Sequence, residues 1–322
     1  MPKVPYTKPH LSFADQIAQL EARGMEIGDQ DAAIQCLRRI GYYRLSAYWY
    51  PFRAPGNGQG AGKSDQFIPG YSLQHAIDLY EYDKALRLLL MDAIERIEIS
   101  ARVEIAYHLG GKDPAAHHNP RVLHPDFTKP MNKKANSKSK YDMWRIDEQN
   151  HYWRSAERFA EHFASKYELP MPIWISVELW DFGMLSKFFA GMTVQDQTYI
   201  ANHYGVPDWK VMASWLRTLN HARNIAAHHS RLWNRNLDDQ PKLPQPGAMP
   251  HFDHLIKDQI TVTSRVYSVL CIVLHLLDRI DPEEGWRDRL RSHLDTFPPV
   301  PNLGLTQMGF PAGWERQAIW NP

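Results

Sequence analysis

Residues 208–236 read DWKVMASWLRTLNHARNIAAHHSRLWNRN, and their apolar side chains recur at intervals of three and four. A helix has 3.6 residues per turn, so this spacing gathers the apolar side chains into one stripe along it. The stripe contains Met212, Trp215, Leu216, Leu219 and Ala226. We therefore predict a helix over residues 207–231.

The same spacing recurs along most of the chain, whereas alternating strand patterns are weak throughout. The longest repeat predicts a helix over about 72–109, which Gly110 and Gly111 end. Further helices are expected over 145–166, 173–190, 194–204 and 250–280. The sequence therefore predicts an all-α fold.

The first 60 residues (1–60) are expected to form a small helix-turn-helix-like lobe. Ser12 can cap a first helix at its N-terminus. Asp29 or Asp31 can cap a second helix, which ends at Gly41.

Three further segments follow this lobe. Residues 54–70, rich in Gly, Pro, Ser and Gln, are expected to form a flexible linker or loop. The main helical domain then spans 71–297, with an insertion at about 112–145 where helical periodicity fails. The Pro- and Gly-rich residues 298–322 are expected to form an extended tail. Three aromatic side chains would pack that tail on the body: Phe310, Trp314 and Trp320.

Charge is balanced over the whole chain but not within the insertion. The 322 residues carry 37 Lys and Arg against 36 Asp and Glu, which excludes a protein that holds nucleic acid by bulk charge. Residues 121–145 are strongly basic, and such a loop either grips a phosphate backbone or is simply solvated. The candidate RNA-binding cations are Lys129, Lys133, Lys134, Lys138, Lys140 and Arg145.

Residues 42–53, YYRLSAYWYPFR, combine five aromatic residues with two arginines. Such side chains can stack on bases and hold phosphates. They can equally pack the lobe into a core, which is the more common role. The candidates for RNA contact are Tyr42, Tyr43, Arg44 and Trp49.

Several other classes of protein are disfavoured. Cys36 and Cys271 lie far apart, so neither a disulfide framework nor a thiolate zinc site is indicated. No apolar run is long enough to cross a bilayer and no signal peptide is evident, so we expect a cytoplasmic protein with no membrane contact. The pairs His117-His118 and His228-His229 suggest a metal hydrolase only weakly, since no H-E-x-x-H motif is present. We expect no metal and no cofactor.

Arg223 is the chemically informative residue of the 208–236 helix. It falls in the apolar stripe, and a buried arginine needs a carboxylate, a phosphate or an interface, because an unpaired buried charge is costly. A second face repeats polar side chains at the same intervals: Arg217, Asn220, Asn224, His228 and Arg231.

This polar face suits a phosphodiester. Histidine can move protons at the 2′-hydroxyl and the leaving oxygen, and arginine can hold the charge that develops on the phosphate oxygens. RNA supplies its own nucleophile, so no metal is required. Arg223 and His228 point about 140° apart on a regular helix. Either the helix loosens near 226–228, or two protomers form a composite site.

Three stretches resemble the Abi-like family of bacterial phage-resistance proteins. They are IGYYRLSAYWYPF at 40–52, AIERIEISARVEIAYHL at 93–109 and RNIAAHHSRLWNR at 223–235, and MGFPAGW at 308–314 is similar too. The family in turn resembles the HEPN ribonucleases, helical bundles whose Arg-x₄₋₆-His motif cuts RNA without metal, commonly across a homodimer.

The resemblance implies specific roles. Arg223 and His228 would be catalytic, Asn224 would orient them, and Asn220, His229 and Arg231 would support them. The expected protein is an RNA-cleaving toxin of a toxin–antitoxin or abortive-infection system, regulated by a bound small RNA and leaving 2′,3′-cyclic phosphate ends. The alternative is a non-catalytic module that sequesters a structured small RNA. Arg102 and His108 could imitate a second site, although a charged helix face explains them more simply.

Overall fold

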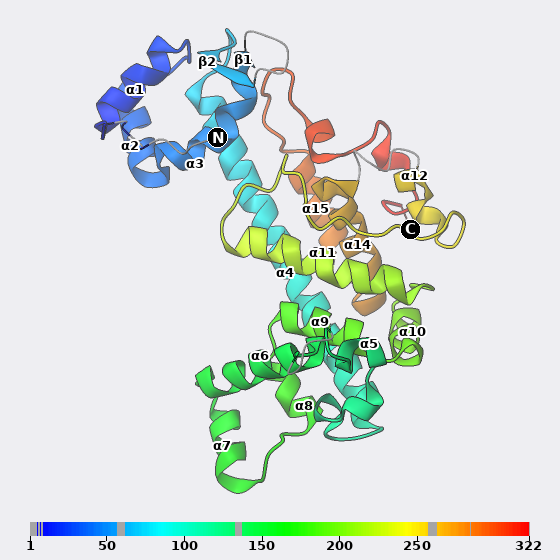
Figure 1. Cartoon of the computed structure of the whole chain (residues 1–322). Helices are drawn as coiled ribbons and strands as arrows, with labels where there is room; N and C mark the ends of the chain where they lie inside the picture. The colour runs from blue at the N-terminus through cyan, green and yellow to red at the C-terminus, as the bar shows by residue number, and fades with distance from the viewer. Residues whose placement is uncertain are drawn as a thin grey trace. The chain divides into compact units, whose positions relative to one another are not determined.

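The computed structural model describes residues 5, 7, 9–56, 62–132, 137–256, 263–283 and 285–321 (Figure 1). Helices dominate this part of the chain, and the sheet found in it has only two short strands, so the predicted all-α fold is confirmed. The chain divides into two compact units. Unit 1 comprises residues 1–86 and 291–307, and unit 2 comprises residues 87–290 and 308–322.

Unit 1 begins with three helices, and the sequence predicted the start of the first two but not of the third. Its first three helices are α1 (Phe13–Ala22), α2 (Gln30–Ile40) and α3 (Tyr42–Trp49), and the 3₁₀ turn η1 (Tyr50–Phe52) follows. The Ser12 hydroxyl accepts a hydrogen bond from the Asp15 N–H at 3.2 Å, and Asp29 Oδ1 accepts one from the Ala32 N–H at 2.9 Å. These side chains satisfy amide groups that the first turn of a helix leaves without partners.

A hairpin replaces part of the predicted linker. Strand β1 (Arg53–Pro55) pairs with the antiparallel strand β2 (Lys63–Phe67), so the linker prediction was wrong over these residues. Strand β2 reads KSDQF, which shows no apolar alternation, and its partner strand rather than its own pattern stabilises it. An ion pair of 3.3 Å between Arg53 and Asp65 joins the two strands.

Aromatic residues of the 42–53 segment build the core of unit 1. Tyr48, Trp49 and Phe52 are at most 1% exposed. The Tyr48 hydroxyl donates to Asp83 Oδ2 at 2.7 Å, near the start of the long helix α4 (Leu73–Gly110). The packing interpretation therefore describes these three rings.

Unit 2 contains the part of α4 from Arg87 onward and most of the helices that follow it in the described chain. These helices are α5 (Pro125–Thr128), α6 (Lys140–Arg154), α7 (Arg158–Lys166), α8 (Ile173–Ser176), α9 (Phe182–Gly191), α10 (Val194–His203), α11 (Trp209–Ala227), α12 (Asp253–Ile256), α14 (Val266–Ile280) and α15 (Trp286–Leu294), whose last residues belong to unit 1. Short 3₁₀ turns occur as η2 (Ala116–His118), η3 (Pro120–Val122), η4 (Val177–Leu179), η5 (Pro250–Phe252), η6 (Leu305–Met308) and η7 (Trp314–Arg316). Helix α11 packs against α9, α10 and α14 (Figure 1).

Four predicted helices of unit 2 differ in the structure. The segment 250–280 contains η5, α12 and α14, and Arg265 is extended directly before α14. The segment 145–166 forms two helices, α6 and α7, which are separated by an extended Ser155 and Glu157. The segment 173–190 also breaks, because the Asp181 side chain accepts from the Met184 N–H at 2.7 Å and starts α9 afresh. Helix α11 ends at Ala227 rather than at 231.

The C-terminal residues of unit 2 pack on α14 through aromatic side chains. Phe310, Trp314 and Trp320 are at most 9% exposed, and the Trp320 indole donates to the Tyr267 hydroxyl at 3.2 Å. Within the described ranges no helix has the length and apolar content needed to cross a bilayer.

Candidate functional site

Helix α11 buries the apolar stripe that the sequence predicted. Met212, Trp215, Leu216, Leu219 and Ala226 are all at most 4% exposed. This burial fixes the helix against its neighbours in unit 2. The residues next to the stripe are therefore held in defined positions.

Arg223 lines a cavity of about 360 Å³, and this volume is within the range of small-ligand sites. Three helices supply its walls. The lining residues are Asp147 and His151 of α6, Asp181 and the first residues of α9 with Lys187, and Asn220, Arg223 and Asn224 of α11. The predicted residues Asn220, Arg223 and Asn224 are thus brought together.

The cavity holds both signs of charge. His151 Nε2 lies 3.5 Å from Asp181 Oδ2, and Lys187 Nζ lies 3.5 Å from Asp147 Oδ2. Asp181 also caps α9, so the same carboxylate fixes a helix end and positions an imidazole. An anion in this cavity would meet Arg223 and Lys187, and the two carboxylates already have neighbouring partners, Lys187 for Asp147 and His151 for Asp181.

Arg223 is half-buried on α11. Its Nη1 donates to Asn224 Oδ1 at 3.4 Å. Burial raises the pKa of Glu98, and the charges of Arg102 and Arg223 oppose that rise. Glu98 pairs directly with Arg102, and Arg223 acts on this carboxylate only through its charge.

Gly183 allows α9 to approach the polar face of α11. A Cβ atom at this position would lie 3.1 Å from Asp181 Oδ1 and 3.5 Å from Asn220 Nδ2. A side chain here would crowd the cavity. Arg217, on the same helix as Asn220, instead pairs with Asp239 at 2.6 Å outside the cavity.

His228 lies just beyond the end of α11 rather than on the helix. The Ser230 N–H donates to the Ile225 carbonyl and the His229 N–H to the Ala226 carbonyl, each at 3.0 Å, which forms a Schellman motif. His229 holds the left-handed position of that motif with φ 55°, where glycine is usual.

The two predicted histidines are therefore separated from the Arg223 cavity. His228 and His229 are exposed, and neither lines the cavity, nor does the half-buried Arg231. The helix stays regular to Ala227, so the first predicted route, a loosened helix near 226–228, is not observed. A composite site between two protomers is the route that remains.

Some of the predicted RNA-binding cations of the insertion are exposed, and others already pair with carboxylates of the chain. Lys138 and Lys140 are exposed. Lys129 forms an ion pair with Asp126, and Arg145 Nη1 donates to Glu148 at 2.6 Å. Lys133 and Lys134 lie outside the described residues.

The predicted RNA-binding residues of unit 1 include both exposed and buried side chains. Tyr43 is 91% exposed, whereas Trp49 is fully buried and offers no ring face to a base. Tyr42 packs edge-on against Trp49, with ring centroids 5.0 Å apart. Arg44 is exposed. Tyr43 is therefore the aromatic residue of this group that a base can reach.

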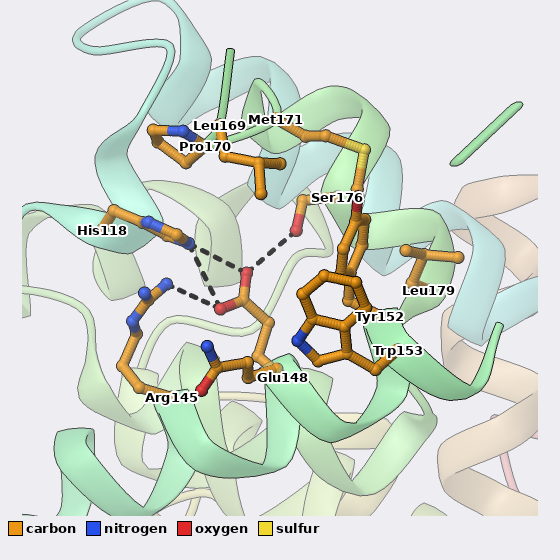
Figure 2. A pocket seen from close by; sticks show the side chains of 11 residues that line it. His118, Arg145, Glu148, Tyr152, Trp153, Leu169, Pro170, Met171, Ser176 and Leu179 are labelled. Atoms are coloured by element: carbon orange, nitrogen blue, oxygen red, sulfur yellow. Dashed lines mark hydrogen bonds and ion pairs between the residues drawn. The ribbon is translucent and has the colours of Figure 1, made fainter. Parts of the chain in front are cut away.

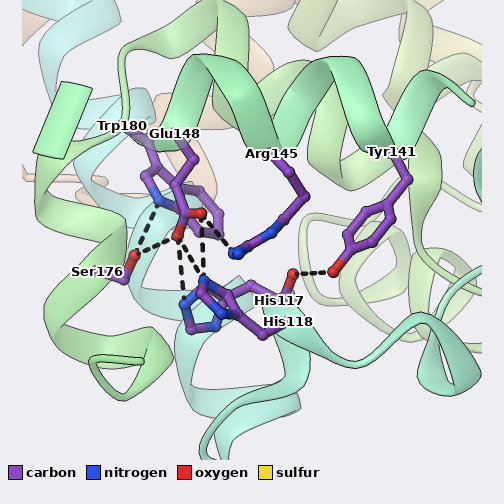
Figure 3. Close-up of polar contacts among 7 residues, drawn as sticks. All are labelled: His117, His118, Tyr141, Arg145, Glu148, Ser176 and Trp180. Atoms are coloured by element: carbon purple, nitrogen blue, oxygen red, sulfur yellow. Dashed lines mark hydrogen bonds and ion pairs between the residues drawn. The ribbon is translucent and has the colours of Figure 1, made fainter. Parts of the chain in front are cut away.

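A second polar cluster gathers around Glu148 (Figure 3). Its carboxylate accepts from Arg145 at 2.6 Å and from Ser176 at 3.1 Å, and its Oε1 lies 3.1 Å from His118 Nε2 and 3.5 Å from His117 Nε2. Glu148, Arg145 and His118 also line a separate cavity of about 300 Å³ (Figure 2). His117, His118 and Glu148 together could hold a metal ion.

Burial controls protonation in this second cluster. It lowers the pKa of His117 to about 3, so the imidazole is neutral at neutral pH. Burial acts to raise the pKa of Glu148. The hydrogen bond and charge of His118, together with the charge of Arg145, outweigh burial and bring this pKa below its usual value. The carboxylate is therefore ionised.

Arg102 and His108 are held by separate partners. Arg102 donates to the Trp180 carbonyl at 2.7 Å and pairs with Glu98. His108 Nε2 lies 2.7 Å from Asp196 Oδ1. These contacts agree with a charged helix face rather than with a second catalytic pair.

Sequence reasoning missed the residues that face Arg223 from other helices. His151, Asp181 and Lys187 lie far from Arg223 in the chain, and no spacing rule relates them. The pair His117-His118 was noticed, but its partner Glu148 comes from another helix. A carboxylate in the helix that follows the His pair was the one available signal.

One comparison with known proteins gives a match. The family model described as Abi-like protein matches residues 35–234, which include both polar clusters. The tail motif at 308–314 lies outside the matched range. No curated protein and no solved structure matches the chain.

Proposed function

The chain belongs to the Abi-like protein family, and on that premise we propose that it is a metal-independent endoribonuclease acting in phage defence by abortive infection. One observation carries the proposal. Arg223 lies half-buried at the wall of an open cavity, flanked by Asn220 and Asn224 on the same helix. A guanidinium and two amides at one cavity are suited to hold a phosphodiester.

The proposed reaction is attack by the 2′-oxygen of RNA on the adjacent phosphorus. The bond from this oxygen to phosphorus forms as the bond to the 5′-oxygen breaks, which leaves a 2′,3′-cyclic phosphate. A base takes the 2′-hydroxyl proton and an acid protonates the leaving 5′-oxygen. Arg223 stabilises the charge on the phosphate oxygens, and Asn220 and Asn224 orient the phosphate.

Two imidazoles are candidates for the proton transfers. His228 matches the expected motif and is exposed at the end of α11, where it can enter the cavity of a second copy. His151 already lines the Arg223 cavity and is positioned by Asp181 at 3.5 Å. A carboxylate that holds an imidazole in place is a common arrangement for acid–base catalysis.

Cleavage of RNA in EDTA by purified full-length variants tests the proposal. We expect Arg223→Ala to remove cleavage, and we expect the loss in His228→Ala or in His151→Ala to identify the proton-transfer residue. His162→Ala removes an exposed imidazole of α7 and should cleave as wild type does. Wild-type rates in Arg223→Ala would end the assignment.

Mixing two inactive variants tests the composite site. If Arg223 of one protomer works with His228 of another, mixed dimers of Arg223→Ala and His228→Ala contain one intact site. Random pairing then restores about a quarter of wild-type activity. Complete inactivity of the mixture, with dimers present, would place both groups in one chain.

RNA sequestration without cleavage is the second candidate function. The exposed Lys138 and Lys140 of unit 2 favour it, because exposed cations can hold the phosphate backbone of RNA. Tyr43, exposed on unit 1, can separately stack on an unpaired base. A small RNA that copurifies with the chain, and is lost in Lys138→Ala/Lys140→Ala, would support this role. Turnover of many RNA molecules per chain would contradict a purely binding role.

A further inference from the structure

Two adjacent imidazoles and one carboxylate converge in unit 2, away from the Arg223 cavity. His117 and His118 come from η2, and Glu148 comes from α6 (Figure 3). Glu148 Oε1 lies 3.1 Å from His118 Nε2 and 3.5 Å from His117 Nε2, and all three ligand atoms lie within 4.8 Å of one another. The ligands of a tetrahedral zinc site are about 3.3 Å apart. We propose that His117, His118 and Glu148 bind a divalent zinc ion.

The unsatisfied state of His117 points to such a ligand. Its side chain is 0% exposed, yet neither ring nitrogen makes a hydrogen bond to any described residue. A buried imidazole in this state has lost its contacts with water without replacement. A metal on Nε2 would supply the missing interaction.

Neighbouring hydrogen-bond donors orient the Glu148 carboxylate toward the two imidazoles. Arg145 donates to Glu148 Oε2 at 2.6 Å, which leaves Oε1 facing the two imidazoles. Ser176 donates to Oε1 at 3.1 Å and accepts from the Trp180 indole at 3.2 Å. Such outer contacts orient metal ligands. The positive charge of Arg145 opposes a cation, so we expect weaker binding than in a closed structural zinc site.

Two nitrogens and one oxygen favour zinc over magnesium or calcium, which prefer oxygen ligands. Three protein ligands leave a fourth position, as in zinc sites that bind water or substrate. The cavity of about 300 Å³ beside His118 and Glu148 gives that position an opening (Figure 2). Its other side is lined by Tyr152, Trp153 and Met171. A molecule that bound zinc from this cavity would therefore be partly apolar.

This site does not depend on the proposed ribonuclease activity, because none of its ligands lines the Arg223 cavity. The test is titration of the EDTA-stripped full-length chain with zinc chloride by calorimetry, with metal content measured after gel filtration. We expect about one zinc ion per chain. Glu148→Gln and His118→Gln should each bind zinc at least about 100-fold more weakly.

The controls separate coordination from folding. His162→Gln removes an exposed imidazole of α7 and should bind zinc as wild type does. Circular dichroism of the metal-free variants checks their fold, and His118, partly exposed, is the substitution that the fold tolerates best. Wild-type protein with no zinc binding below a Kd of about 0.1 mM would overturn the proposal. Unchanged zinc affinity in folded Glu148→Gln and His118→Gln would overturn it equally.

Discussion

The Arg223 cavity and the Glu148 cluster both use residues of α6, but they treat charge differently. In the Arg223 cavity, cations and carboxylates face open space, and Lys187 and Asp181 are exposed. In the Glu148 cluster, a carboxylate 8% exposed is surrounded by donors, and His117 is sealed from solvent. The first arrangement is suited to a phosphate arriving from outside, and the second to a small cation held inside.

The largest expected effect is the loss of RNA cleavage in a variant of the Arg223 cavity that still binds zinc. Arg223→Ala should reduce RNA cleavage by about 100- to 1,000-fold, because a charge-stabilising donor is lost, and should leave zinc affinity unchanged. Arg217→Ala is the matched control, since Arg217 lies on the same helix but pairs with Asp239 outside the cavity. Loss of both activities in Arg223→Ala would mean that the two regions are not separate.

Acid should destabilise the buried cluster. Because the pKa of His117 is about 3 in the folded chain, against an ordinary value of 6.5, the unfolded chain takes up a proton below pH 6.5 that the folded chain does not. Stability therefore falls with falling pH, by about 2 kcal/mol from this group between pH 7 and pH 5. The charged or titratable groups acting on it are His118, Arg145, Glu148 and Asp113.

His117→Phe isolates this contribution, because phenylalanine keeps an aromatic ring but does not titrate. The measurement is the free energy of unfolding in urea with EDTA at both pH values. The lowered pKa of Glu148 matters only at lower pH, where its carboxylate becomes protonated. An equal pH dependence in wild type and in His117→Phe would show that this imidazole is not buried as described.

The smallest expected effect concerns the end of α11. His229 has φ 55°, a conformation that costs an L-residue energy and glycine almost none. His229→Gly should therefore raise the free energy of unfolding by up to about 1 kcal/mol. His228→Gly is the matched control: His228 has φ −86°, so glycine there should destabilise the chain. A lower free energy of unfolding in His229→Gly would contradict the claim that the backbone of His229 is strained.

The sequence predicted local structure better than it predicted either region. Ser12 and Asp29 revealed helix starts because a capping side chain acts within three residues of itself. The apolar stripe of α11 revealed its buried face because helical period alone sets that face. Strand β2 was missed because its pairing with β1, and not its own pattern, makes it a strand.

The part of the candidate site that lies on α11 was predictable because it depends on local spacing, whereas the residues from other helices were not. Asn220 and Asn224 share one predicted polar face, so their spacing placed them together. The sequence assigned Arg223 to the apolar stripe of the same helix, and the structure brings it to the cavity beside them. His151, Asp181 and Lys187 reach the cavity from α6 and α9, whose packing depends on tertiary contacts. His228 was placed on the helix by extending its period, but the Schellman motif ends α11 before that residue.

The chemical ends of RNA fragments made with and without excess EDTA distinguish attack by the 2′-oxygen from metal-dependent cleavage. We expect 2′,3′-cyclic phosphate and 5′-hydroxyl ends from wild-type protein in both conditions, and at least about 100-fold fewer fragments from Arg223→Ala. Fragments with 3′-hydroxyl and 5′-phosphate ends that form only without EDTA would contradict this expectation. Such ends would assign the cleavage to a metal centre instead.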